Sequence, residues 1–276
     1  MLRGTPKPIP PAPPTVKRAI AVREAPRYHS ITEGFTYGPT LPFLVPYSKE
    51  FAHLTDAKLF QLMKKSNASV YGYDKKGGCH ANFKLSKLID THLDPKKKLG
   101  VSIVDSPVAL TRLPREFTQH HRKSRVDRSL STIALGQTPV LTDSGSYTYL
   151  HFDPVQFGGG WMYIAEGKKI WNFLDPRWIP EIYDRKEDKP SDINPKSFLE
   201  WVSAQPRRVK LFQEAPLLTT VAEAGSFTYF PPGWLHQVWT PMRATGIGGY
   251  LRPNGTLSYA NSVKRELASH DISAEW

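Results

Sequence analysis

The sequence predicts a mainly β protein with helical additions, organised around two short segments that carry imidazole and carboxylate groups. The first segment, Tyr147–Asp153, has the pattern of an extended strand and contains His151 and Asp153. A glycine-rich turn follows, then a strand whose pattern places a lysine on its buried face. His236 comes later, at the start of another strand. A double-stranded β-helix requires this order of elements, so we expect a jelly-roll core.

The three polar residues of these segments are candidate metal ligands. Alternate side chains of a strand point to the same face, so His151 and Asp153 present an imidazole and a carboxylate together. His236, which follows the turn Pro231–Gly233, would supply a second imidazole. Two imidazoles and one carboxylate that leave open positions are typical of non-haem Fe(II) oxygenases. A zinc hydrolase remains an alternative, but the general base that it needs is not identifiable in the sequence.

Local patterns predict the elements before this core. Residues 1–28 are basic and rich in proline, which indicates an extended tail. A short apolar run bounded by prolines at residues 42–46 indicates an edge strand. Thr55 and Asp56 offer an N-cap for a helix over residues 57–65, and a second helix is expected around residues 83–89.

The β-rich core is expected to start near residue 131. Its elements would be strands at 131–135 and 147–152, a hairpin over 161–174, and strands at 227–230, 237–240 and 245–251. An insertion at 177–212 would contain a helix at 195–202, and a short helix would follow the core at 262–267. The predicted division is a tail (1–28), a cap of helices and strands (29–128), the core (129–256) and a C-terminal segment (257–276).

Composition restricts the chemistry and the partners. The single cysteine, Cys79, rules out an internal disulfide and a thiolate zinc cluster, and it suits a reducing compartment. A net charge of +12 and a pI near 9.6 favour acidic partners such as nucleic acid or nucleosomes. Residues 112–128 are strongly basic and are candidates for nucleic-acid contact, with a solvated loop as the alternative. No apolar run is long enough to cross a membrane.

Residues 130–252 also resemble a known family, the JmjC class of Fe(II)- and 2-oxoglutarate-dependent oxygenases. The segments that carry the resemblance are Tyr147–Asp153, Phe157–Gly159, Trp161–Ile164, Gly167–Trp171, Pro232–Pro241 and Gly248–Gly249. Within this class the chain resembles the histone lysine demethylase branch that includes the plant-homeodomain-linked enzymes. The resemblance implies Fe(II) held by His151, Asp153 and His236, with 2-oxoglutarate as co-substrate and O2 as oxidant.

A lysine would bind the far carboxylate of the co-substrate. Lys169 shares a strand face with Trp171 and Phe173, so it would point into the barrel, where a cation is costly unless it meets an anion. This makes Lys169 a better candidate than Lys168. The motif of the family places its co-substrate lysine at the same position.

The resemblance assigns two further co-substrate contacts. Thr148 matches the hydroxyl donor of the family, although strict alternation would send it to the opposite face from His151, so a twist or bulge is expected between them. Tyr163 is the candidate for the tyrosine that contacts the co-substrate. The interval from Asp153 to Trp161 is one residue longer than in the demethylases, which leaves the position of this tyrosine open.

The implied reaction is hydroxylation of an N-methyl group on lysine in a protein substrate, first of all a histone tail. A nuclear location would follow, with the cytoplasm and the mitochondrion as alternatives. Tyr250 stands after Gly248–Gly249 where the demethylases have an asparagine, so a protein or RNA hydroxylase is an alternative. A non-catalytic cupin-like module that docks on chromatin or RNA is a third hypothesis, against which the intact ligand set argues.

Overall fold

The computed structural model describes residues 23–66, 69–74, 79–94, 96–99, 101–103, 137–151, 153, 158–180, 217–251, 253 and 256–269. Several expectations lie wholly or mostly outside the described residues: the tail at 1–28, the basic segment 112–128, the strand at 131–135, and the insertion at 177–212 with its helix at 195–202.

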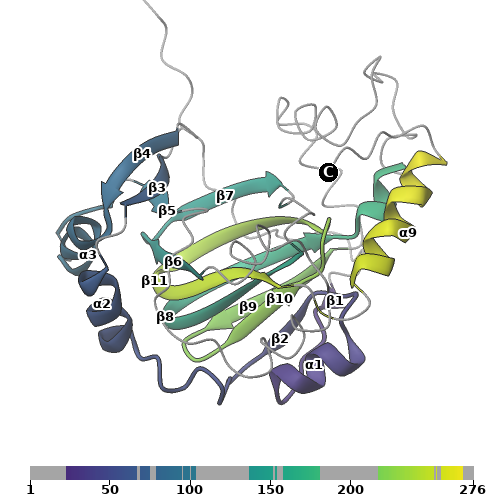
Figure 1. The fold of residues 1–276 in the computed structure, drawn as a ribbon, viewed down its shortest axis with the longest axis horizontal. Helices are drawn as coiled ribbons and strands as arrows, with labels where there is room; N and C mark the ends of the chain where they lie inside the picture. Colours follow the sequence, from purple (N-terminus) through teal and green to yellow (C-terminus); the bar gives the residue numbers. More distant parts are fainter. Residues whose placement is uncertain are drawn as a thin grey trace, which may run out of the picture.

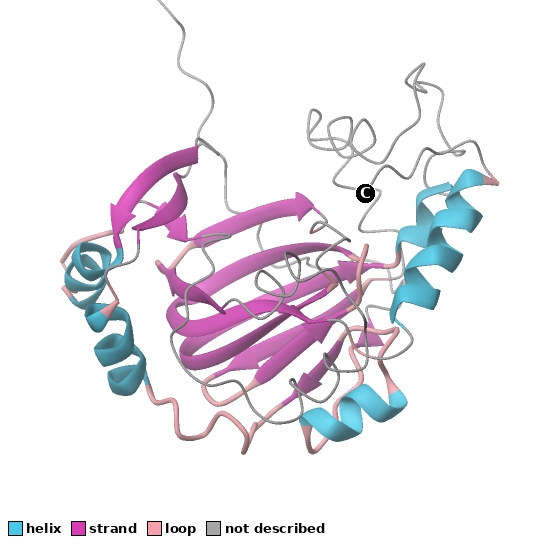
Figure 2. Ribbon diagram, viewed as in Figure 1, coloured by secondary structure: helices cyan, strands magenta, loops and turns pink. Residues whose placement is uncertain are grey.

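An eight-stranded sheet curls through the centre of the molecule (Figures 1 and 2). Its main path runs through β1 (Arg23–Glu24), β9 (Leu218–Glu223), β8 (Gly159–Leu174), β10 (Phe227–Phe230) and β2 (Phe43–Val45). The long strand β11 (Leu235–Leu251) pairs with β8 on one edge and with β6 (Gln137–Thr142) and β7 (Ser146–His151) on the other. This curled, mainly β architecture confirms the predicted jelly-roll fold class.

The two longest strands differ from what the sequence predicts. Instead of a hairpin over 161–174, β8 is one continuous strand that bends at Gly167, where φ is +90°. A Cβ at Gly167 would lie 1.9 Å from the Arg243 carbonyl oxygen, so glycine allows β8 and β11 to approach closely here. A glycine in a β-rich sequence can therefore mark a bend within one continuous strand and not the turn of a hairpin. Similarly, the strands expected at 237–240 and 245–251 are parts of the single strand β11.

Two helices and a small sheet cover one end of the main sheet (Figure 1). Helix α2 (Asp56–Lys65) begins after Thr55, whose hydroxyl accepts a hydrogen bond from the Lys58 backbone N–H, so the predicted cap is confirmed. Helix α3 (Leu85–Leu93) packs beside α2 and confirms the second predicted helix with shifted bounds. The three-stranded sheet consists of β4 (Cys79–Lys84), β3 (Ser69–Asp74) and β5 (Val101–Ile103).

The remaining helices of the described residues lie against the edges of the core. Helix α1 (Ile31–Tyr37) packs on β2, which is an edge strand as predicted. Helix α9 (Thr256–Ala268) contacts the short 3-10 helix η2 (Pro176–Trp178) at the opposite end from α2 and α3 (Figure 1). Among the described residues, the structure has no helix with the length and apolar character needed to cross a bilayer.

Phe51 joins the N-terminal region to the main sheet. Its side chain is fully buried and stacks on the rings of Trp161, Tyr163 and Phe227, with centroid distances of 5.6, 5.1 and 6.0 Å. Residues that precede α2 therefore complete the hydrophobic core on this face of β8 and β10.

We predict that Phe51→Ala lowers the free energy of unfolding by about 3–5 kcal/mol, because it removes a fully buried ring and leaves a cavity. Denaturant unfolding followed by tryptophan fluorescence measures this change. Tyr47→Ala is the matched control, since Tyr47 is 59% exposed, and it should cost less than about 0.5 kcal/mol. Equal losses for the two variants would contradict the assigned role of Phe51.

Candidate metal centre

The three predicted metal ligands meet at one end of the paired strands β7 and β11. His151, the last residue of β7, lies directly opposite His236 of β11, and their ring centroids are 4.2 Å apart. The Asp153 Oδ1 atom lies 3.5 Å from His151 Nε2 and 4.0 Å from His236 Nε2. Since their candidate ligand atoms all lie within 4.8 Å of one another, these residues could hold one metal ion.

The surroundings orient His236 for metal binding. Its Nδ1 lies 3.2 Å from the Trp234 carbonyl oxygen, so an Nδ1–H group donates there and Nε2 remains free to coordinate. Burial, together with the nearby charge of His151, lowers the pKa of His236 to about 4. The imidazole is therefore neutral at pH 7, which is the form that binds metals.

The surroundings of Asp153 favour the ionised form of its carboxyl group. Burial acts to raise the pKa of its carboxyl, but the charge of His236 and the hydrogen bond and charge of His151 outweigh burial, so the pKa lies below its usual value. One carboxylate with two imidazoles is a donor set that fits Fe(II) and other first-row divalent ions.

A cavity of about 130 Å³ opens beside these ligands. Thr148 also lines this cavity. On β11, His236 and Val238 are two residues apart, but they pair with His151 and Thr148, which are three residues apart on β7. This irregularity is a bulge of the kind that the sequence required to bring Thr148 and His151 to one side.

Lys169 points into the same cavity. Its side chain is only 5% exposed, and its Nζ donates hydrogen bonds to Thr142 Oγ1 and Thr240 Oγ1, both at 3.1 Å. Burial lowers the pKa of Lys169 to about 7. Lys168, in contrast, lies outside and pairs with Glu223 at 2.8 Å, which agrees with the choice of Lys169.

The structure does not bring Tyr163 to the cavity. Tyr163 is buried on the other side of β8, where its ring stacks on Phe51, and its neighbour Met162 lines the cavity instead. The candidate co-substrate contact at Tyr163 is therefore not supported by its position. The extra residue in the glycine-rich interval before β8 made the face of this tyrosine impossible to derive from the sequence.

Sequence reasoning missed Thr142 and Thr240, the two hydrogen-bond partners of Lys169. They lie 27 and 71 residues away from Lys169 in the chain, so no local spacing connects them to it. Only the pairing of β6, β8 and β11 brings these hydroxyls together.

We predict that Asp153→Ala weakens binding of a divalent metal ion by more than about 100-fold, because it removes the only anionic donor of the described ligand set. Titration with Mn(II) or Co(II), followed by calorimetry, measures the affinity. Asp175→Ala is a matched control, since Asp175 is also buried but bonds to Arg177 away from the cavity. Metal affinity that is retained in Asp153→Ala would rule out this site.

A family model described as a cupin-like domain matches residues 86–255, and no curated protein sequence matches the chain. The matched segment includes β6 to β11, the three candidate ligands and Lys169. Since it spans more than half of the chain and its strands form the curled sheet described above, the chain belongs to the cupin-like domain family.

Proposed function

We propose that this chain is an Fe(II)- and 2-oxoglutarate-dependent oxygenase. The observation that carries the proposal is a buried lysine that shares a cavity with a His–Asp–His set. Within the described part of the chain, Lys169 Nζ bonds only to two neutral threonine hydroxyls. Burial of an ammonium group without an anion costs free energy, so a ligand with a carboxylate group would stabilise this site.

A dicarboxylic keto acid fits both parts of this cavity. One end would chelate a metal ion held by His151, Asp153 and His236, and the far carboxylate would bond to Lys169 and Thr148. Bound iron, 2-oxoglutarate and O2 would together supply the oxidation of a C–H bond. The apolar side chains of the cavity wall would limit the entry of water; they are Trp171, Phe230 and Val238.

We propose methyl-lysine in a protein as the substrate class, with a histone tail as the first candidate. The JmjC-like motifs around His151 and His236 support this choice. Hydroxylation of an N-methyl carbon gives a carbinolamine, which breaks its C–N bond to release formaldehyde and the amine. A nuclear location and nucleic-acid contact through residues 112–128 belong to the same proposal.

Stable hydroxylation of protein or RNA is the second candidate. Tyr250 lines the cavity at the position where the demethylases have an asparagine, so the substrate side differs from theirs. The product distinguishes the candidates, because a demethylase releases formaldehyde and a hydroxylase leaves an oxygen atom on its substrate.

We predict 2-oxoglutarate-dependent conversion of a methyl-lysine peptide with Fe(II) and ascorbate, followed by mass spectrometry of the peptide and a formaldehyde assay. RNA and unmethylated peptides should be tested in parallel. Asp153→Ala should abolish conversion, and Asp175→Ala should retain it. Absence of succinate formation with every substrate class, in a protein that binds iron, would favour the non-catalytic docking module.

We further predict that Lys169→Met abolishes 2-oxoglutarate binding but raises the thermal midpoint of the unliganded protein at pH 7. The pKa of Lys169 is about 7 in the folded chain and 10.5 as its ordinary value, so folding opposes its protonation. This cost is full below about pH 7 and disappears as the pH rises to about 10.5, so the gain in the variant should shrink over that range.

Lys168→Met is the control for both measurements. Lys168 forms an exposed ion pair with Glu223, so its replacement should change the stability little at any pH and leave ligand binding intact. A stabilising effect of Lys169→Met that did not depend on pH would contradict the assignment of a buried, easily deprotonated amine.

A further inference from the structure

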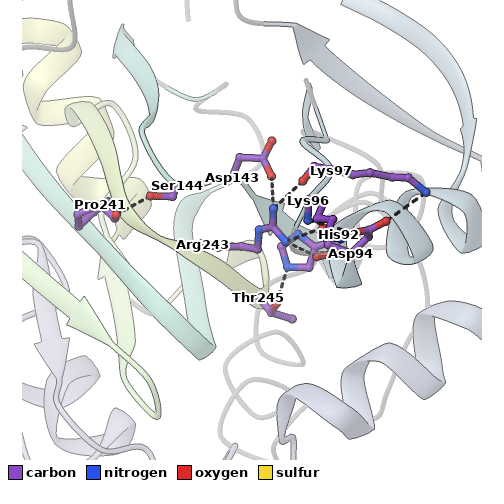
Figure 3. A network of polar contacts seen from close by, with 9 residues as sticks. All are labelled: His92, Asp94, Lys96, Lys97, Asp143, Ser144, Pro241, Arg243 and Thr245. Atoms are coloured by element: carbon purple, nitrogen blue, oxygen red, sulfur yellow. Dashed lines mark hydrogen bonds and ion pairs between the residues drawn. The ribbon is translucent and has the colours of Figure 1, made fainter.

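The turn between β6 and β7 lies next to both threonines that hold Lys169. Thr142 is the last residue of β6, and the turn Asp143–Gly145 follows it directly. The Gly145 backbone N–H donates to the Thr240 carbonyl oxygen at 2.7 Å, and the Ser144 hydroxyl donates to the Pro241 carbonyl oxygen at 2.7 Å (Figure 3 shows the latter). The turn is thus bonded to β11 at Thr240 and its neighbour.

Arg243 connects this turn to helix α3 (Figure 3). Its Nη2 lies 3.5 Å from Oδ1 of the buried Asp143 and donates to the Lys97 carbonyl oxygen at 2.8 Å. Its Nη1 donates to the carbonyl oxygens of His92 and Asp94. Carbonyl groups at a helix C-terminus lack partners inside the helix and favour a cation, so one guanidinium satisfies the end of α3 and the turn together.

A second contact fixes α3 on β11. The His92 Nε2 atom lies 3.0 Å from Thr245 Oγ1, and the His92 side chain is buried (Figure 3). Burial, followed by the positive charge of Arg243, lowers the pKa of His92 to about 4, so this imidazole is neutral at pH 7. The end of α3 is therefore held at two points, one on each side of Ala244.

We infer that Arg243 is a positioning residue for Lys169. By holding the turn Asp143–Gly145 between α3 and β11, Arg243 keeps Thr142 and Thr240 within hydrogen-bond distance of the Lys169 ammonium group. Helix α3 lines no part of the cavity described here, yet it supports carboxylate binding through this chain of contacts. The effect on the ligand rests on the proposed function, whereas the effect on Lys169 itself does not.

Loss of the guanidinium should act on the amine in a definite direction. The buried Asp143 carboxylate would lose a cationic neighbour, and the turn Asp143–Gly145 would lose its connection to α3. Thr142 and Thr240 would then accept less well from Lys169, and the pKa of its ammonium group would fall. Loss of a positive charge alone would raise that pKa, so a fall reports the lost threonine contacts.

The experiment compares Arg243→Gln with the matched control Arg177→Gln. Arg177 also pairs with a buried carboxylate, Asp175, but it belongs to η2, and its guanidinium lies over the ring of Tyr259 in α9. Calorimetry with Mn(II)-loaded protein gives the affinity for 2-oxoglutarate. Competitive labelling of Lys169 with acetic anhydride across pH, with peptide mass spectrometry, gives the titration midpoint of the amine without any ligand.

We expect Arg243→Gln to weaken 2-oxoglutarate binding by about 3- to 30-fold, with unchanged Mn(II) affinity, and to lower the labelling midpoint of Lys169. Arg177→Gln should leave both values as in the wild type. Arg243→Lys retains the charge but cannot reach the carboxylate and the carbonyl groups together, so it should recover only part of the affinity. Asp143→Asn tests the same contact if Arg243→Gln does not fold, and it should weaken 2-oxoglutarate binding, whereas removal of an anion alone would not weaken the binding of an anionic ligand.

An Arg243→Gln protein that loses thermal stability but keeps the wild-type midpoint and affinity would overturn the inference, because Arg243 would then only stabilise the fold. An upward shift of the midpoint would overturn it as well. A wild-type protein that binds metal but no 2-oxoglutarate would refute the proposed function instead, and the labelling midpoint would still decide the role of Arg243.

Discussion

The antiparallel pairing of β8 with β11 is the constraint on which the rest of the structure depends. The pairing extends from Leu235 opposite Leu174 to Leu251 opposite Gly159. It therefore includes the strand segments that carry His236 and Lys169. His236 on β11 lies opposite Phe173 on β8 and opposite His151 on β7, so one strand fixes two of the ligands. A slip of one residue would turn His236 away from its partners, because side chains alternate between faces.

Irregular pairing gives this long pair the curvature of a jelly roll. The register shifts between Trp239 and Thr245, where β11 passes the bend of β8 at Gly167. Bulges of this kind bend a strand and redirect its side chains. Lys169 and Arg243 both lie in this irregular region, so the bend that closes the barrel also places the cavity lysine and the guanidinium that contacts α3.

Residues of this site that lie close together in the chain could be predicted from the sequence, whereas those from distant segments could not. His151 and Asp153 are two residues apart, and Lys169 follows from alternation within its own strand, so local patterns were sufficient. Thr142, Thr240 and Arg243 come together only through strand pairing between distant segments, and no local pattern indicates them. The strand β9, Leu218–Glu223, was missed because its sequence mixes polar and apolar residues, and only Thr220 and Ala222 among its six side chains are buried.

The segment that matches the cupin-like family, residues 86–255, is smaller than the structural unit. Strands β1 and β2 belong to the main sheet, and Phe51 fills the core behind Trp161 and Phe227. Buried apolar area is the main source of stability, so the sheet without these residues would expose several large rings to water. The residues that hold the cavity in shape therefore extend well before the residues that line it, and the N-terminal region is part of the same folded unit as the candidate metal centre.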